Sequence, residues 1–209
     1  MPRTLSGLRA FALGLGTVAA TLASTGTAAA APRAHALLNL ACPTATATPF
    51  APWGDGASYA LAPDGGLENS STGWTLAGGA AVVPGNEAFA VSGPGRSSLS
   101  LPAGSSATSA PMCVALGSGK MRFFTANAGA AGSRLHVQIV YRGGLGGILG
   151  IVDAGTVSSG KAWQPSSSVG MLGGLVPLLT QSVQFRFTPL DTTGSWRIDD
   201  IYLDPLMHR

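Results

Sequence analysis

The sequence is poor in charge and shows no sustained helical pattern. Only 10% of its 209 residues are charged, whereas 45% are hydrophobic, and it contains 30 glycines and 14 prolines. A coiled coil or long-helix protein would be rich in Glu, Lys and Arg, so this composition excludes one. A disordered chain would be strongly charged and poor in hydrophobic residues, which argues against bulk disorder. The length predicts one domain of ordinary size.

Long hydrophobic runs are also missing, and the one apolar stretch near the N-terminus predicts a secretion signal. Arg3 and Arg9 make a positive start, residues 10–23 are apolar, and small residues at 24–31 fit a cleavage site. No run reaches the roughly 18 uninterrupted apolar residues that a membrane-spanning helix needs. We therefore predict a signal peptide over residues 1–30, a secreted protein, and no membrane insertion after cleavage.

Cysteine and histidine are scarce, which limits metal and thiol chemistry. The two cysteines are Cys42 and Cys113, and the three histidines are scattered. These residues are too few and too far apart in sequence to predict a zinc site. Two cysteines in an exported protein predict one disulfide, Cys42–Cys113. In the chain-entropy model its loop of about 70 residues would stabilise the fold by roughly 4 kcal/mol.

Basic residues do not cluster. The signal removes Arg3 and Arg9 from the 12 basic residues, so the remaining ones nearly balance the 9 acids. They are scattered along the chain and form no stripe that could neutralise phosphates. We therefore expect no nucleic-acid partner.

The chain after the signal divides into a tether and a folded domain. Residues 31–51 are mostly Ala, Pro and Thr without a clear pattern, which predicts an extended tether. From Pro52 onward, turn signals rich in Gly, Pro, Asn and Asp arrive at short intervals. We place the folded domain at residues 52–209.

Short runs with a two-residue period predict strands in this domain. The clearest runs are 134–142 and 183–188, in which apolar and polar residues alternate. Many short strands separated by turns predict an all-β protein, an antiparallel β-sandwich or barrel. The glycine-dense segment 143–155 fits either a loop or a strand that another backbone approaches closely.

Two short motifs stand at the ends of the predicted domain. Gly-Gly-Leu-Glu-Asn at 65–69 is followed by Gly-Trp at 73–74, and Trp-Arg-Ile-Asp-Asp-Ile-Tyr-Leu stands at 196–203. This pair of motifs resembles the jelly-roll carbohydrate-binding modules of the galactose-binding-like class. The chain after the signal is also similar to small secreted actinobacterial proteins of unknown function. The resemblance implies a jelly-roll sandwich that binds carbohydrate without catalysis.

The last motif contains a break in its alternation. Its apolar positions before Asp199-Asp200 are even-numbered (Trp196 and Ile198), and those after it are odd-numbered (Ile201 and Leu203). A β-bulge at Asp199-Asp200 would bring both apolar pairs to the same face, because it adds one residue to the strand. We therefore predict a bulge there.

Two adjacent carboxylates in an apolar strand need compensation. In the resembling modules, a structural calcium often lies between the opening Glu and the closing Asp, which implies Glu68 with Asp199 or Asp200 as its ligands. The alternatives are compensation by an arginine such as Arg197, or backbone hydrogen bonds to one Asp while the other is solvated. In each case we expect Glu68 and the two aspartates to lie at one place in the fold.

Sugar binding needs aromatic side chains for the apolar faces of the rings and polar side chains for the hydroxyls. Trp53 and Trp163 could supply the aromatic surface. Polar residues on one side of the predicted strands could line a sheet face, namely His136, Gln138, Gln184 and Arg186. The alternative is that these polar residues only solvate an outer face; we expect Trp74 and Trp196 in the core.

Signals for catalysis are weak. Nothing among the nine acids selects a glycosidase pair, and no G-x-S-x-G motif accompanies His136. Residues 117–120 lack the flanking residues of a phosphate-binding loop. We therefore predict a secreted, monomeric, non-enzymatic module that binds cell-wall or environmental glycans. The alternative is an extracellular structural or protein-interaction domain without a small ligand.

Overall fold

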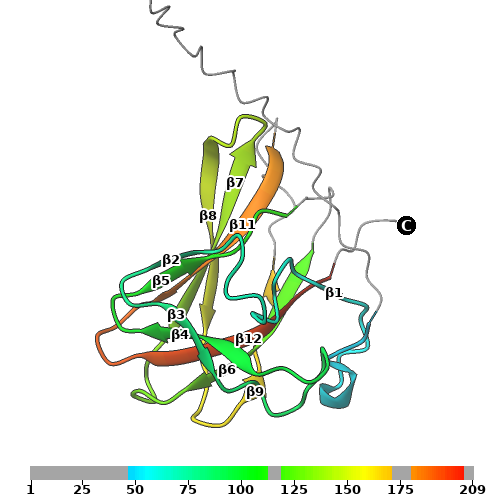
Figure 1. Cartoon of the computed structure of the whole chain (residues 1–209), viewed down its shortest axis with the longest axis vertical. Coiled ribbons are helices and arrows are strands. Elements are labelled where there is room, and N and C mark those ends of the chain that lie inside the picture. The colour runs from blue at the N-terminus through cyan, green and yellow to red at the C-terminus, as the bar shows by residue number, and fades with distance from the viewer. Residues whose placement is uncertain (1–46, 113–118, 171–179, 205–209) are drawn as a thin grey trace, which may run out of the picture. The chain divides into compact units, whose positions relative to one another are not determined.

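The structure is a computed structural model that describes residues 47–112, 119–170 and 180–204 (Figure 1). Within these ranges the chain forms twelve strands and one 3-10 helix, η1 (Ala51–Trp53). One sheet has seven strands: β1 (Ala60–Leu61), β3 (Ala81–Pro84), β4 (Ser97–Pro102), β6 (Lys120–Asn127), β9 (Gln164–Pro165), β10 (Val169–Gly170) and β12 (Ser195–Asp204). The other has five: β2 (Thr75–Ala77), β5 (Ser106–Thr108), β7 (Leu135–Gly143), β8 (Ile148–Val157) and β11 (Thr180–Pro189).

Every strand pair in these two sheets is antiparallel. The seven-stranded sheet has the order β10-β6-β12-β4-β3, with β1 beside β12 and β9 beside β6, and the five-stranded sheet has the order β2-β5-β11-β7-β8. The chain changes sheet from β4 to β5, from β5 to β6 and from β6 to β7, as in a jelly roll. The predicted all-β antiparallel sandwich is confirmed. The glycine-dense segment divides into a turn after β7 and the strand β8.

The main hydrophobic core lies between the two sheets. The alternation over residues 135–141 is confirmed, because Leu135, Val137, Ile139 and Tyr141 all belong to this core. Trp196 is fully buried, and Trp74 is also buried and stacks on Phe187 with ring centroids 6.2 Å apart. Facing strands of two packed sheets each contribute alternate side chains to such a layer. The predicted core positions of both tryptophans are therefore confirmed.

A second, smaller aromatic cluster covers the outer face of the seven-stranded sheet. It contains Phe50, Tyr59, Phe124 and Tyr202. The backbone of Ala47 pairs with that of Tyr59 through two hydrogen bonds of 3.2 and 2.7 Å. Phe50 is fully buried, so the folded part begins before the start at Pro52 that the composition suggested. The Ala/Pro/Thr-rich composition of 31–51 gave no sign that one aromatic residue at its end would anchor it.

The predicted β-bulge in β12 is confirmed. The register between β12 and β6 shifts between Asp199 and Tyr202, and Asp200 has a left-handed φ of 47°. On either side of the shift, both apolar pairs reach the main core. The bulge therefore keeps the whole apolar side of β12 buried, although its sequence changes parity at the aspartates.

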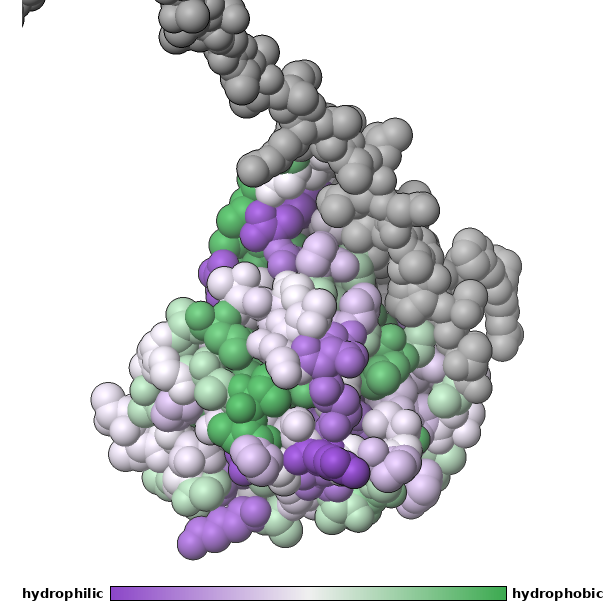
Figure 2. All heavy atoms as spheres, in the orientation of Figure 1, coloured by the Kyte–Doolittle hydropathy of each residue, from purple (hydrophilic) through white to green (hydrophobic). Residues whose placement is uncertain are grey.

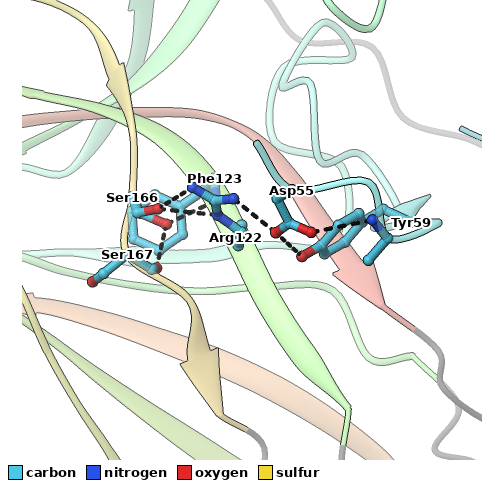
Figure 3. A network of polar contacts seen from close by, with 7 residues as sticks. Asp55, Tyr59, Arg122, Phe123, Ser166 and Ser167 are labelled. Atoms are coloured by element: carbon cyan, nitrogen blue, oxygen red, sulfur yellow. Dashed lines mark hydrogen bonds and ion pairs between the residues drawn. The ribbon is translucent and has the colours of Figure 1, made fainter. Parts of the chain in front are cut away.

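Arg122 joins three segments on the outer face of the seven-stranded sheet (Figure 3). Its Nη1 donates to Asp55 Oδ2 at 2.7 Å, and its Nε and Nη2 donate to the carbonyl oxygen of Ser166 at 3.1 and 2.9 Å. Tyr59 also donates its hydroxyl to Asp55 Oδ2 at 2.7 Å. Burial opposes ionisation of Asp55, but these bonds hold its pKa below the usual value. The guanidinium also lies over the Phe50 ring, 4.5 Å from its centroid.

Several predictions fall outside the described residues. They are the signal peptide over 1–30, most of the tether, and the disulfide between Cys42 and Cys113. Among the described residues, no helix has the length and apolar character needed to cross a membrane.

Candidate functional site

A row of polar side chains crosses all five strands of the five-stranded sheet. Strand register places Thr75 opposite Thr108, Thr108 opposite Arg186, Arg186 opposite Gln138, and Gln138 opposite Asp153. Directly paired residues of antiparallel strands share a face of the sheet. Because their neighbours along β7 and β11 fill the core, these five side chains lie on the outer face. We call them the polar row.

His136 extends this polar surface by one step along the strands. It pairs with Thr188 and Thr156, and its Nε2 lies 3.1 Å from Asp153 Oδ1. The same carboxylate oxygen accepts a hydrogen bond of 2.7 Å from the amide of Gly155. The bonds from Gly155 and His136 lower the pKa of Asp153. Asp153 therefore stands as a carboxylate at one end of the row.

Gln184 lies on the same face but is buried, with 6% of its surface exposed. Its Oε1 accepts a hydrogen bond from Arg142 Nε, and its Nε2 donates to the carbonyl of Ser109 at 2.6 Å. Arg142 is fixed further by a 2.7 Å bond from Nη1 to the carbonyl of Gly146. Both ends of the Gln184 amide are occupied. Gln184 therefore positions Arg142, in contrast to the direct glycan contact that its place on a polar strand side suggested.

The two arginines on this face have no carboxylate partner in the described part of the chain. The ion pairs found there are Arg122 with Asp55 and His136 with Asp153. Arg186 makes one weak side-chain contact, from Nε to Thr108 Oγ1 at 3.4 Å. Among the described residues, the outer face of the five-stranded sheet therefore presents two guanidinium groups and a single carboxylate.

Apolar side chains border the polar row on the edge strand β8. Ile151 is opposite Val140, and Ile148 is opposite Arg142. These two isoleucines are 44% and 51% exposed. A ligand on this face would therefore meet hydrogen-bonding groups beside exposed apolar groups.

The two predicted tryptophans lie on the opposite side of the sandwich. Trp53 is 36% exposed and packs edge-on against Phe89, with ring centroids 4.7 Å apart. Trp163 is half-buried against the second aromatic cluster, and the Arg197 guanidinium lies 6.0 Å from its ring centroid. The structure thus brings His136, Gln138 and Arg186 together but separates them from both tryptophans. Strand parity shows which residues share a side of a strand, but it does not show which sheet the strand joins.

On the face of the molecule shown in Figure 2, the apolar surface is divided into small patches. On the face shown there, several green patches are separated by white and purple residues. An open hollow of about 660 Å³ is lined mainly by the apolar side chains of Leu76 and residues 80–84, with Ser70, Ser71, Arg96 and Ser97. The residues of the polar row do not line it.

Asp199 and Asp200 lie beneath the loop 85–96 on the outer side of the seven-stranded sheet. The amides of Glu87 and Asp200 donate to Asp199 at 2.9 and 2.8 Å. Asp200 accepts bonds from the hydroxyl and amide of Ser92 at 2.7 and 3.3 Å. The buried Glu87 carboxylate in turn accepts bonds from the amides of Phe89 and Val91. These three acids form a buried carboxyl cluster that holds the loop.

Burial dominates the electrostatics of this carboxyl cluster. It raises the pKa of Asp199 to about 8, and the charges of Asp200 and Glu87 add to the effect. It also raises the pKa of Asp200 to about 6, with contributions from the charges of Glu87 and Glu68. The charge of Glu68 therefore contributes to the raised pKa of Asp200, and the proximity of Glu68 to both aspartates stays a prediction.

The arrangement does not fit a calcium site. Glu68 is exposed, and its Oε1 accepts bonds of 2.8 and 2.9 Å from the amides of Arg96 and Ser97. The part of the chain that the structure describes contains no group of three His, Cys, Asp or Glu side chains arranged to hold a metal ion. Arg197 makes no ion pair with either aspartate and donates instead to Ser98 Oγ and nearby carbonyls. Backbone amides and hydroxyl donors satisfy these carboxyl groups.

The site residues predicted from the sequence did not include several that the structure places in these sites. Arg142 and Thr108 stand on the polar side of short strands, so alternation could have added them. Asp153 lies in a glycine-dense segment whose pairing is not evident from sequence. Glu87 and Phe89 belong to a loop without periodicity, and only the folded chain shows that they contact β12 and Trp53.

The chain has been compared with known proteins. No family model matches it, and no curated relative matches it. The xylan-binding domain CBM22-1 of Xyn10C from Paenibacillus barcinonensis shares 15% identity with it at a TM-score of 0.49, over 69% of this chain and 93% of that one. TmCBM61 in complex with β-1,4-galactotriose shares 18% identity at a TM-score of 0.45, over 68% and 96%. The enzymatically active domain of tailspike protein 4 of bacteriophage CBA120 shares 16% at 0.47, over 68% and 21%. The strand pairing described above, and not these similarities, establishes the sandwich architecture of this chain.

Proposed function

We propose that this chain is an exported, non-catalytic glycan-binding module whose ligand lies across the outer face of the five-stranded sheet. The observation that carries the proposal is the polar row, which continues without interruption over all five strands. Five strands span four spacings of about 4.8 Å, or roughly 19 Å. A surface of this length suits an extended chain of sugar units better than one small molecule.

The chemistry of the row suits sugar hydroxyl groups. Arg186 offers several donors, Gln138 both donates and accepts, and the Asp153 carboxylate accepts. The exposed Ile151 beside them provides apolar contact for the C–H faces of the rings. Polar groups fix the orientation of such a ligand while apolar contact removes surface from water.

A binding role without catalysis is the simpler account of this face. Glycoside hydrolysis uses two carboxyl groups on either side of the bond that is cleaved. Asp153 is the single carboxylate among the described side chains of the row and of its extension at His136. The buried Glu87, Asp199 and Asp200 lie on the other side of the sandwich.

The test is a polysaccharide pull-down with the exported chain and two variants. The double variant Gln138→Ala/Arg186→Ala should reduce retention at least tenfold without a large change in melting temperature, because both side chains are only half-buried. The matched control is Trp53→Ala on the opposite side, which should keep binding. Loss of binding in Trp53→Ala alone would move the site to the aromatic side. No retention on any polysaccharide would refute the proposed function.

A second candidate function is protein interaction through β8. Its edge is apolar: Ile148, Leu149 and Ile151 are 51%, 42% and 44% exposed, and Leu145 in the preceding turn is 85% exposed. An exposed apolar edge strand can add a strand from another chain. Ile151→Lys should abolish such an interaction, which size-exclusion chromatography with light scattering would detect as a change in mass. Unchanged mass in the wild type at high concentration would count against self-association.

A further inference from the structure

We propose that the glycan bound on the outer face of the five-stranded sheet is anionic, carrying carboxylate or sulfate groups. This inference rests on the proposed function and names the ligand class for the same face. The surface offers two guanidinium groups that have no acidic partner among the described residues, and an anionic ligand would supply one.

The charge on this face is unbalanced in a chain that is otherwise nearly neutral. The titratable groups that face outward from β7, β8 and β11 in the described residues are Arg142, Arg186, His136 and Asp153. The one carboxylate is already engaged by His136 and the amide of Gly155. Within the described ranges neither arginine therefore pairs with an acid, which distinguishes both from Arg122 with its 2.7 Å bond to Asp55.

Arg186 has the donors that an oxyanion requires. Among the described residues, its one side-chain hydrogen bond runs from Nε to the hydroxyl of Thr108, at a long 3.4 Å. Neither of its terminal nitrogens makes a hydrogen bond with a described residue. The side chain is half-buried beside Gln138 in the row. A guanidinium held this way can bind a carboxylate or sulfate through two parallel bonds.

Arg142 supplies a second positive point farther along the strands. Its Nε and Nη1 are fixed by Gln184 and the Gly146 carbonyl, so the group is held in place before any ligand arrives. Arg186 is opposite Gln138, and Arg142 follows four residues later on β7. At about 3.3 Å per residue, the two arginines are separated by roughly 13 Å along the strand direction, and they lie on neighbouring strands.

Two fixed cations at this spacing favour a polymer over a small anion. A chain with repeated acidic groups can contact both arginines, whereas a single small anion contacts one. Binding at two points raises the apparent affinity because the second contact becomes intramolecular. The same guanidinium chemistry fits carboxylates and sulfates, so the ligand panel must separate these two sources.

The experiment measures binding to four immobilised polymers: polygalacturonate (carboxylated), dextran sulfate (sulfated), and neutral xylan and dextran as uncharged partners. The full exported chain is assayed at about 20 mM and 300 mM NaCl, since screening weakens exposed ionic contacts. We expect at least tenfold tighter binding to one charged polymer than to either neutral one, with most of the difference lost at high salt. Tighter binding to polygalacturonate would identify carboxylates as the anionic groups of the ligand, and tighter binding to dextran sulfate would identify sulfates.

Variants assign the effect to these arginines. Arg186→Gln and Arg142→Gln should each weaken binding to the charged polymer about tenfold and reduce its salt dependence. Arg186→Lys keeps the charge but loses the paired donors, so it should recover only part of the affinity. The control is Arg96→Gln, an exposed arginine beside β4 of the other sheet, which should bind as the wild type does.

Two results would overturn this inference, and they differ from failure of the proposed function. Equal binding to charged and neutral polymers, lost in the Gln138→Ala/Arg186→Ala variant, would keep the glycan module and refute its anionic ligand. Equal loss in Arg96→Gln and Arg186→Gln would show that net charge, and not this face, causes binding. If the chain bound neither the four polymers nor any other polysaccharide, the proposed function itself would be refuted.

Melting temperatures within about 3 °C of the wild type confirm that each variant is folded, since about 1 kcal/mol shifts the midpoint by 2–4 °C for a domain of this size.

Discussion

The amide of Glu87 donates a 2.9 Å hydrogen bond to Asp199 Oδ2, and this bond joins a loop to the last strand across 112 positions of sequence. The Glu87 side chain then turns back to accept bonds from the amides of Phe89 and Val91. One residue is thus a donor to the strand and an acceptor for its own loop. The loop 85–96 is consequently held by carboxyl groups that are themselves buried.

The raised pKa of Asp199 predicts that the free energy of unfolding falls as the pH rises. Its pKa is about 8 in the folded protein and 3.8 ordinarily, so between these values the folded state keeps a proton that the unfolded state has released. The stabilising effect is complete below pH 3.8 and is lost as the pH rises towards 8. One pKa unit corresponds to about 1.4 kcal/mol, so we expect a loss of a few kcal/mol in the free energy of unfolding. Urea unfolding at pH 5, 7 and 9 measures it.

Asp199→Asn should remove much of this dependence, because the amide stays neutral at every pH. We expect the variant to be less stable than the wild type at pH 4, because its Nδ2 cannot accept one of the two amide bonds, and its free energy of unfolding to vary less between pH 5 and 9. The control is Asp191→Asn. Bonds from Ser133 and Thr193 lower the pKa of Asp191 to about 2, so its stabilisation is present above pH 3.8 and lost towards pH 2. This control should leave the slope above pH 5 unchanged. A wild type with flat stability from pH 5 to 9 would contradict the assignment.

Arg122→Ala should destabilise the fold by about 2–4 kcal/mol, because it leaves the Asp55 carboxylate and the Ser166 carbonyl without their partner in a partly buried site. Arg122→Lys should cost less, since it keeps the charge but cannot make all three bonds. Lys161→Ala, at an exposed position, should change stability by no more than about 0.5 kcal/mol. Denaturant unfolding compares the three, and equal values for Arg122→Ala and Lys161→Ala would show that the network is not structural.

Phe50→Ala tests whether the segment before Pro52 belongs to the fold. The ring is fully buried and contacts Tyr59, Phe124 and Tyr202, so its removal should cost about 3–5 kcal/mol. Trp53→Ala, three residues later and 36% exposed, should cost clearly less. Thermal unfolding of both variants gives the comparison. A Phe50→Ala variant as stable as the wild type would mean that residues up to 51 are a tether after all.

Chelation should leave the fold unchanged. Glu68 already accepts two backbone bonds, and the aspartates of the carboxyl cluster accept theirs from amides and from Ser92, so no cation is needed to satisfy them. We expect EDTA and added calcium to shift the melting temperature by less than about 1 °C at fixed pH, since a ligand stabilises only the state it binds. A rise of several degrees with calcium, reversed by EDTA, would restore the calcium site that the family resemblance implied.

Sequence reasoning predicted the fold where a local pattern has one structural solution. The alternation in 134–142 required a strand with a buried side, and the parity change at Asp199-Asp200 required a bulge. Both follow from strand geometry alone. Phe50 shows the limit, because nothing in its neighbourhood marks a single aromatic residue as buried; its partner Phe124 lies on β6, far along the chain.

The candidate site was predictable only in part for a similar reason. His136, Gln138 and Arg186 follow from alternation, and the register of β7 and β11 brings them together. Trp53 and Trp163 were grouped with them by chemistry, but the sheet to which a strand belongs depends on long-range pairing. Gln184 has the same polar pattern as Gln138, yet packing buries one and leaves the other half-exposed.

The bulge in β12 also determines where the length of this chain can change. Asp200 is the added residue, and the bulge lets Ile198 and Ile201 face the same core in spite of it. If Asp200 were deleted, Ile201 would follow Asp199 directly, and the strand would alternate regularly with Ile201 and Leu203 still facing the core. Deleting a residue before the bulge, such as Arg197, would instead turn over the positions that follow it, because side chains alternate between the two faces of a strand. Length variation in the final strand should therefore be tolerated at Asp200 and excluded elsewhere, whereas the turns between strands should accept it generally.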